Sequence, residues 1–196
     1  MFNKIVFGLL LLGFIVTHAA PLTNDTQTTS TNPFLNKSEI LYSILNNPEG
    51  LTKYDVQRVM KKAFNAWSAA IPLTFTEVHP KNMPADIQIS FIPERQDGFF
   101  KGAYARATLY SEIFFNSDYK WKVYFPYDKY DETMLDLYYN ALFAVGQVLG
   151  LENNSNPRSI MYDKYILPVD PNENYVEQKL SPEDIQAAQA IYGTKN

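Results

Sequence analysis

The stretch 132-ETMLDLYYNALFAVGQVLGLEN-153 decides the fold. We predict a helix from about Glu132 to Leu149, because Gly150 is a natural left-handed residue at which a helix ends. The other elements are arranged around this central helix, one helix and several strands before it and a last helix after it.

Two further helices carry clear start signals. Upstream, Thr52 and Asp55 form the pattern of a capping box. Apolar residues then recur at helical spacing, namely Val56, Val59, Met60, Ala63, Trp67 and Ala70. Downstream, Ser181 is the expected cap of a last helix, Pro182 takes its first position and Gly193 ends it.

Short apolar runs predict strands at 40–45, 73–78, 85–92, 103–109 and 120–125. The third run alternates, with Ile87, Ile89 and Phe91 on one face. The order of these elements predicts a layered α/β or α+β fold with one sheet and three helices.

Composition excludes several classes of function. The chain has 196 residues, 46% of them hydrophobic, which suits one folded domain. Seventeen Lys and Arg stand against twenty-one Asp and Glu, so a nucleic-acid partner is not expected. There is no cysteine, which excludes disulfides, thiolate chemistry and Cys-ligated metals. There are only two histidines, His18 and His79.

The chain begins like a secretory protein. Lys4, an apolar run and Thr17-His18-Ala19 predict a signal peptide over residues 1–19, and no later run is long enough to span a membrane. Residues 20–38 are Thr- and Asn-rich and read as a flexible tail, 39–193 as one domain, and 194–196 as a second tail. We therefore expect a secreted chain with one histidine, no membrane contact, and glycosylation sequons at Asn24, Asn36 and Asn153.

Five stretches resemble the catalytic domain of a matrixin (matrix metalloproteinase, of the metzincin group). They are 51–68, 72–78, 85–91, 159–165 and 180–193, and they follow in the family's order. The resemblance implies a metzincin-like α+β fold with a twisted, mostly parallel sheet and three helices. It also implies that Met161 belongs to the Met-turn and that Tyr162 and Tyr165 lie on the wall of a specificity pocket.

The catalytic motif of that family is absent. Matrixins hold zinc with H-E-x-x-H-x-x-G-x-x-H, whose glutamate deprotonates the metal-bound water. Here Phe143, Gln147 and Asn153 occupy the histidine positions, and Ala144 replaces the glutamate. A phenyl ring has no lone pair and carboxamides are weak zinc ligands, so we predict no catalytic zinc, and no enzymatic activity.

The sequence also bears on two other metal sites, the structural zinc of the family and calcium. The resemblance places Arg106 and Tyr124 where the family's structural zinc takes histidines, so this ion is not expected either. Calcium stays possible, because acidic residues occur in plausible loops, namely Asp97, Asp118, Asp128 and Asp131.

Three functions remain open. The first is an extracellular protein- or peptide-binding module, a pseudoprotease whose cleft contains Gln147, Met161, Tyr162 and Tyr165. The second is a structural component of an extracellular matrix or secretion. The third is the zinc metalloendopeptidase that the family resemblance alone would imply. His79 is the single histidine that remains after signal removal, which is too few for the catalytic site of such an enzyme.

Overall fold

The computed structural model describes residues 32–79, 81, 83–95 and 99–195, and residues from Asn32 onward form one compact unit. The predicted signal peptide, the sequon at Asn24, most of the predicted tail and Asp97 lie outside the described residues.

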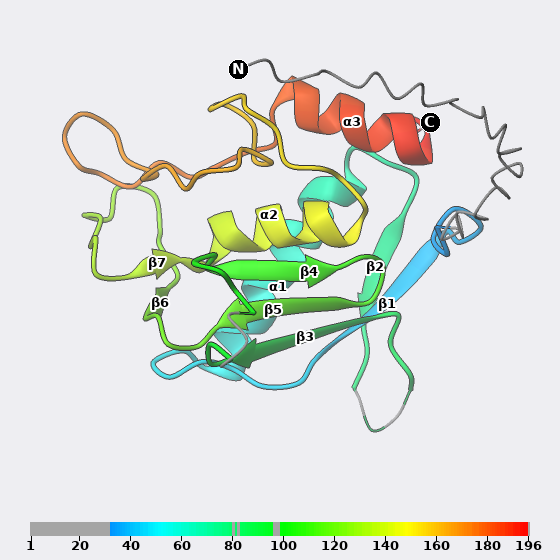
Figure 1. Ribbon diagram of the computed structural model, residues 1–196, viewed down its shortest axis with the longest axis horizontal. Coiled ribbons are helices and arrows are strands. Elements are labelled where there is room, and N and C mark those ends of the chain that lie inside the picture. Colours follow the sequence, from blue (N-terminus) through cyan, green and yellow to red (C-terminus); the bar gives the residue numbers. More distant parts are fainter. Residues whose placement is uncertain (1–31, 80, 82, 96–98, 196) are drawn as a thin grey trace, which may run out of the picture. The chain divides into compact units, whose positions relative to one another are not determined.

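A five-stranded sheet forms the centre of the domain (Figure 1). Its strands are β1 (Glu39–Ile44), β2 (Thr74–Glu77), β3 (Ile87–Ile92), β4 (Ala105–Thr108) and β5 (Glu112–Asn116). They lie in the order β2-β1-β3-β5-β4, and every pairing is parallel except the antiparallel pair of β4 with β5. The predicted α+β fold with a mostly parallel sheet is confirmed.

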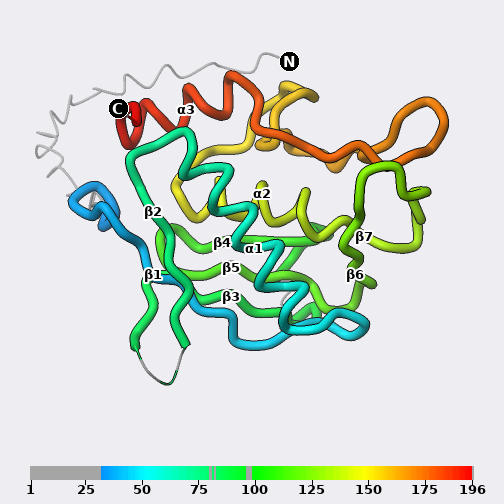
Figure 2. The backbone as a smooth tube through the Cα atoms, turned by 180° about the vertical axis from the view of Figure 1, so that it is seen from behind, coloured from blue at the N-terminus to red at the C-terminus, as the bar shows by residue number. Residues whose placement is uncertain are grey.

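Three helices accompany the sheet: α1 (Lys53–Ser68), α2 (Leu137–Val148) and α3 (Pro182–Tyr192). The Thr52–Asp55 capping box and the Ser181 cap with Pro182 form as predicted. Gly150 has φ +91°, the left-handed conformation expected after α2. Both views show α2 beside β4, at the edge of the sheet (Figure 2).

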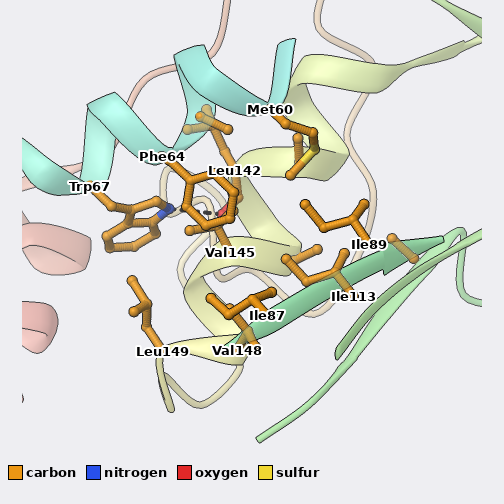
Figure 3. Packing of buried hydrophobic residues seen from close by; sticks show 14 of the residues in the cluster. Met60, Phe64, Trp67, Ile87, Ile89, Ile113, Leu142, Val145, Val148 and Leu149 are labelled. Atoms are coloured by element: carbon orange, nitrogen blue, oxygen red, sulfur yellow. Dashed lines mark hydrogen bonds between the residues drawn. The ribbon is translucent and has the colours of Figure 1, made fainter. Parts of the chain in front are cut away.

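The core lies where α1 and α2 meet the sheet. Figure 3 shows Trp67 of α1, Leu142 of α2 and Ile89 of β3 in one cluster, and all three are fully buried. The Trp67 indole N–H donates to the Leu142 carbonyl oxygen at 3.0 Å, so the one polar atom of the ring is satisfied inside the core. This packing fixes α2 and therefore every side chain that the helix presents to the site.

One strand was not predicted, and the bounds of two predicted elements were wrong. Strand β5 was missed, because its residues 112–116 do not alternate between polar and apolar. The run 120–125 forms only β6 (Trp121–Lys122), which pairs with β7 (Leu135–Asp136) in a second sheet of two strands. Helix α2 begins at Leu137 rather than near Glu132, since Asp136 is its N-cap and accepts from the Tyr138 N–H at 2.9 Å.

The packed domain also begins before the predicted boundary at residue 39. Phe34, within the predicted tail, is 1% exposed and meets the Tyr110 ring edge-on at 5.4 Å. The Asn32 side chain donates to the Tyr192 hydroxyl, which in turn donates to the Leu149 carbonyl oxygen. Residues 32–38 therefore contribute to the fold and are not a free tail.

Candidate functional site

Helix α2 and the loop after it bring together two of the positions that hold zinc in matrixins. The Gln147 Nε2 atom donates a hydrogen bond to Asn153 Oδ1 at 3.3 Å. The other amide atom, Gln147 Oε1, is buried without a partner among the described residues. The two carboxamides are thus linked to each other, and the structure brings these two positions together.

The remaining two positions of the motif carry hydrocarbon. Phe143 lies one turn before Gln147 on α2 and is half-buried against the core. Ala144 is fully buried and has no group that could take a proton. With a phenyl ring, a methyl group and two amides bonded to each other, this set of residues does not fit a zinc ion.

Met161 lies beneath α2 and does not reach the cleft. It is 1% exposed, and a Cβ atom placed on Gly146 would come within 2.4 Å of its Sδ atom and 2.9 Å of the Trp67 ring. Gly146 is therefore the residue that lets α2 approach Met161 closely. The prediction that Met161 lines a binding cleft was wrong, because its side chain fills the core instead.

A cavity of about 140 Å³ opens beside the N-terminal half of α2. Its walls come from three segments: residues 102–105 at the start of β4, one face of α2, and the loop that includes 162–165. Both predicted cleft tyrosines, Tyr162 and Tyr165, line it, and so does Phe143, whereas Gln147 does not. The cavity has the size of one side chain and is smaller than typical small-molecule pockets.

Tyr165 organises the wall of this cavity. Its ring stacks on Tyr139 at 4.9 Å between centroids and meets Tyr104 edge-on at 5.3 Å. Its hydroxyl shares a hydrogen bond of 2.9 Å with the Tyr130 hydroxyl. Burial raises the pKa of both hydroxyls, to about 12 for Tyr130, so both stay neutral at physiological pH.

Sequence reasoning missed the charged group behind this wall. Asp136, the N-cap of α2, has no exposed surface. Burial raises its pKa to about 6, although hydrogen bonds from the Tyr175 hydroxyl and the Tyr138 N–H favour the charged form. The Tyr175 hydroxyl does not satisfy Asp136 Oδ2, which has no well-formed hydrogen bond among the described residues. The signal was present as an aspartate before an apolar helix, but helix prediction from Glu132 placed it inside the helix.

The second metal position of the family is filled by a cation and aromatic rings. Arg106 of β4 lies directly opposite Phe114 of β5, and its guanidinium lies 5.4 Å from the Phe99 ring centroid and donates to the Phe99 carbonyl oxygen. The Phe99 and Phe114 rings meet edge-on at 5.2 Å. The strand that pairs with β4 is β5.

Tyr124 lies in a different cluster. Its hydroxyl donates to the Asp131 carbonyl oxygen at 2.9 Å, and its ring stacks on Tyr130 and Tyr175.

The described candidates for calcium each cap a turn. Asp118 accepts from the Glu94 N–H, Asp128 from the Phe125 N–H, and Asp131 from the N–H and hydroxyl of Thr133. Within 32–79, 81, 83–95 and 99–195, no three histidine, aspartate or glutamate side chains are gathered as a metal site would require. Calcium binding stays a prediction.

The surface sequons and the histidine complete the predicted sites. Asn36 and Asn153 are both exposed. His79 is exposed in a turn, where its Nδ1 accepts from the Lys81 N–H at 3.3 Å. Among the described helices, none has the length and apolar character needed to cross a bilayer.

Comparisons with known proteins agree with this architecture. The chain is 34% identical over 164 residues to matrix metalloproteinase-C of Caenorhabditis elegans, a match that covers 80% of this chain and 28% of that protein. It is 31% identical over 172 residues to interstitial collagenase of Sus scrofa, covering 83% of this chain and 33% of the collagenase. Stromelysin-1 of Mus musculus is 29% identical over 173 residues, covering 83% and 34% respectively. The chain thus spans about a third or less of these relatives.

The model of the matrixin family matches residues 33–193. This range covers most of the chain, includes all three helices and both sheets, and begins next to the buried Phe34. The protein belongs to the matrixin family.

Proposed function

We propose that this matrixin is a pseudoprotease that binds an extended peptide without cleaving it. The observation that carries the proposal is the Gln147–Asn153 hydrogen bond at two ligand positions, together with Ala144 in place of the general base. Peptide hydrolysis at neutral pH needs an activated water, and this set of residues offers neither a zinc ligand nor a base to activate one.

The means of binding are retained where those of catalysis are lost. Strand β4 pairs only with β5 among the described strands, so one of its edges can accept an extended segment. The cavity beside Tyr165 adjoins the start of this strand. A peptide strand added along β4 could therefore place one side chain into the cavity, with main-chain hydrogen bonds giving affinity and the cavity giving selectivity.

The test measures binding and cleavage in the same sample. A library of fluorescent hexapeptides is titrated against the full chain with and without added zinc, using anisotropy for binding and mass spectrometry for cleavage. We expect saturable binding of a subset of peptides and no zinc-dependent product. Zinc-dependent turnover would overturn the proposal.

A matched pair of variants locates the binding. Tyr165→Ala removes the ring that stacks on Tyr139, whereas Tyr165→Phe keeps the ring and loses only the hydrogen bonds of the hydroxyl, to Tyr130 and to the Asp136 backbone. We expect a loss of binding of about tenfold or more for Tyr165→Ala and close to none for Tyr165→Phe. Equal binding by both variants would place the peptide elsewhere, and no binding by the unmodified chain would favour a structural role.

We also propose secretion and glycosylation, on the signal-like residues 1–19 and on the exposure of Asn36 and Asn153. Expression in a eukaryotic secretory host tests both. The expected result is protein in the medium that lacks residues 1–19 and loses mass on treatment with an N-glycosidase. Retention in the cell with an intact N-terminus would contradict it.

A further inference from the structure

We propose that the cavity beside α2 selects a cationic side chain, of arginine or lysine, from the bound peptide. The inference rests on the proposed peptide binding and names the chemistry of the ligand. Three features support it: the aromatic lining of the cavity, the charges at its mouth, and a buried carboxylate that belongs to none of the described ion pairs.

Aromatic residues supply much of the lining. They are Tyr104, Tyr139, Phe143, Tyr162 and Tyr165. The faces of aromatic rings carry negative electrostatic potential, and groups of such rings bind organic cations. Phe143, which stands in place of a zinc-ligating histidine, adds a ring to this lining. The substitution that removes a metal ligand thus adds a ring that a cation can contact.

The charges at the mouth oppose each other. Asp163 and Lys164 are adjacent, both are exposed, and both line the cavity. Their fields largely cancel and are screened by solvent, so neither decides the selectivity.

Asp136 carries a negative charge that none of the described ion pairs balances. It has no exposed surface, its Oδ2 has no well-formed hydrogen bond, and the ion pairs of the described residues do not include it. Two lining residues contact it directly: Asn140 Nδ2 donates to the Asp136 carbonyl oxygen at 2.8 Å, and the Tyr165 hydroxyl hydrogen-bonds to the Asp136 backbone. The backbone of Asp136 therefore lies next to two residues that line the cavity.

A buried anion without a cation is costly, and its field is weakly screened in the protein interior. A guanidinium or ammonium group in the cavity would contact the aromatic rings and would also be attracted by the negative charge of Asp136. A neutral apolar side chain would gain only burial. The arrangement thus favours the cation, and it favours arginine most because the planar guanidinium also stacks on aromatic rings.

The selectivity depends on pH through Asp136. The groups around it are Tyr138 and Tyr139 of α2, Tyr124 and Tyr130 before β7, Tyr165, and Tyr175 with Glu177 in the loop before α3. Burial raises the pKa of each tyrosine, so the tyrosines stay neutral between pH 5 and 8. Glu177 is held in an ion pair with Lys62. Loss of the preference for a cation below about pH 6 would therefore follow protonation of Asp136.

The experiment compares three peptides that differ at a single position, which carries arginine, citrulline or leucine. Citrulline has the shape of arginine without its charge. We expect the arginine peptide to bind the full chain about tenfold more tightly than the citrulline peptide at pH 7.4, by fluorescence anisotropy, with the difference shrinking at pH 5. Asp136→Asn keeps an oxygen for the N-cap and removes the charge, so this variant should lose most of the difference.

The outcomes separate the two proposals. Equal binding of the arginine and citrulline peptides, or tighter binding of the leucine peptide, overturns the cation preference and leaves peptide binding standing. No binding of any of the three peptides, nor of the wider library, overturns both. A full preference for arginine in folded Asp136→Asn overturns the role of Asp136. The comparison of peptides on the unmodified chain needs no variant to fold.

Discussion

The two halves of α2 differ in what replaces the chemistry of the family. In the C-terminal half, Ala144 and Gln147 stand at positions that a metalloprotease fills with a base and a ligand, and nothing ionisable takes over. In the N-terminal half, Tyr139 lines a cavity, and the buried N-cap residue Asp136 contacts two other lining residues, Asn140 and Tyr165, through its backbone. Phe143 lies between the halves and belongs to both, as a lost ligand and a wall of the cavity. Under the proposed function, the residues that replace a metal site leave the peptide-binding surface beside it in place.

The largest expected effect comes from restoring zinc ligands to the C-terminal half of α2 and the loop after it, which we call the emptied half. This variant would break the contrast between the two halves. The triple variant Phe143→His, Gln147→His, Asn153→His puts imidazoles at two positions that a hydrogen bond already joins, Gln147 and Asn153, and at Phe143, one turn before Gln147 on α2. We expect stoichiometric zinc binding by isothermal calorimetry, with affinity on the order of 100-fold or more above that of the unmodified chain.

The matched control keeps Gln147 and carries only the outer two histidines. It should bind zinc far more weakly, because it lacks the central ligand of the set. A folded triple variant without zinc binding would show that the loop at Asn153 has departed from the geometry of the family.

The second prediction concerns the charge of the other half. The pKa of Asp136 rises from an ordinary 3.8 to about 6 on folding, so the folded state binds the proton more tightly than the unfolded state. The free energy of unfolding should therefore rise by about 2 kcal/mol as the pH falls from 6 to 4, and change little above pH 7 as far as this group is concerned.

Urea denaturation across this range measures the effect. Asp136→Asn should remove the slope between pH 4 and 6 and be the more stable protein at pH 7. The exposed Asp131, whose pKa is lowered by its hydrogen bonds to Thr133, acts in the opposite sense and at lower pH. A stability curve of the same shape in both proteins would contradict the buried-charge account.

The sequence predicted the scaffold better than it predicted the site. Capping residues and helical spacing located α1 and α3 because such signals are local. Strand β5 and the short β7 depend on partners distant in the chain, and the register that sets Phe114 opposite Arg106 cannot be read from either segment alone. Asp136 illustrates the same limit: its chemistry comes from burial among tyrosines, and burial of a single polar residue follows from tertiary packing.

The third prediction extends the comparison to the second metal position. Arg106→Ala removes a guanidinium that contacts the Phe99 ring and its carbonyl oxygen, and should lower the free energy of unfolding by about 2 kcal/mol. Arg106→Lys keeps the charge without the planar group and should cost about 1 kcal/mol. Urea denaturation of the two variants and the unmodified chain measures this. Equal stability of all three proteins would show that the contact of Arg106 with Phe99 does not stabilise the fold.

The smallest expected effect distinguishes the contributions of the Gln147 and Asn153 side chains to stability. Gln147→Leu removes a long hydrogen bond of 3.3 Å to the exposed Asn153, but it also removes a buried Oε1 without a well-formed partner. Leaving such an atom unpaired costs more than an exposed hydrogen bond contributes, so we expect Gln147→Leu to be neutral or to stabilise by about 1 kcal/mol. Asn153→Ala loses only the bond and should destabilise by about 0.5 kcal/mol. Opposite signs in thermal denaturation would mean that the emptied half keeps a polar residue that folding does not require, whereas a clear loss for Gln147→Leu would mean that Oε1 has a partner in solution.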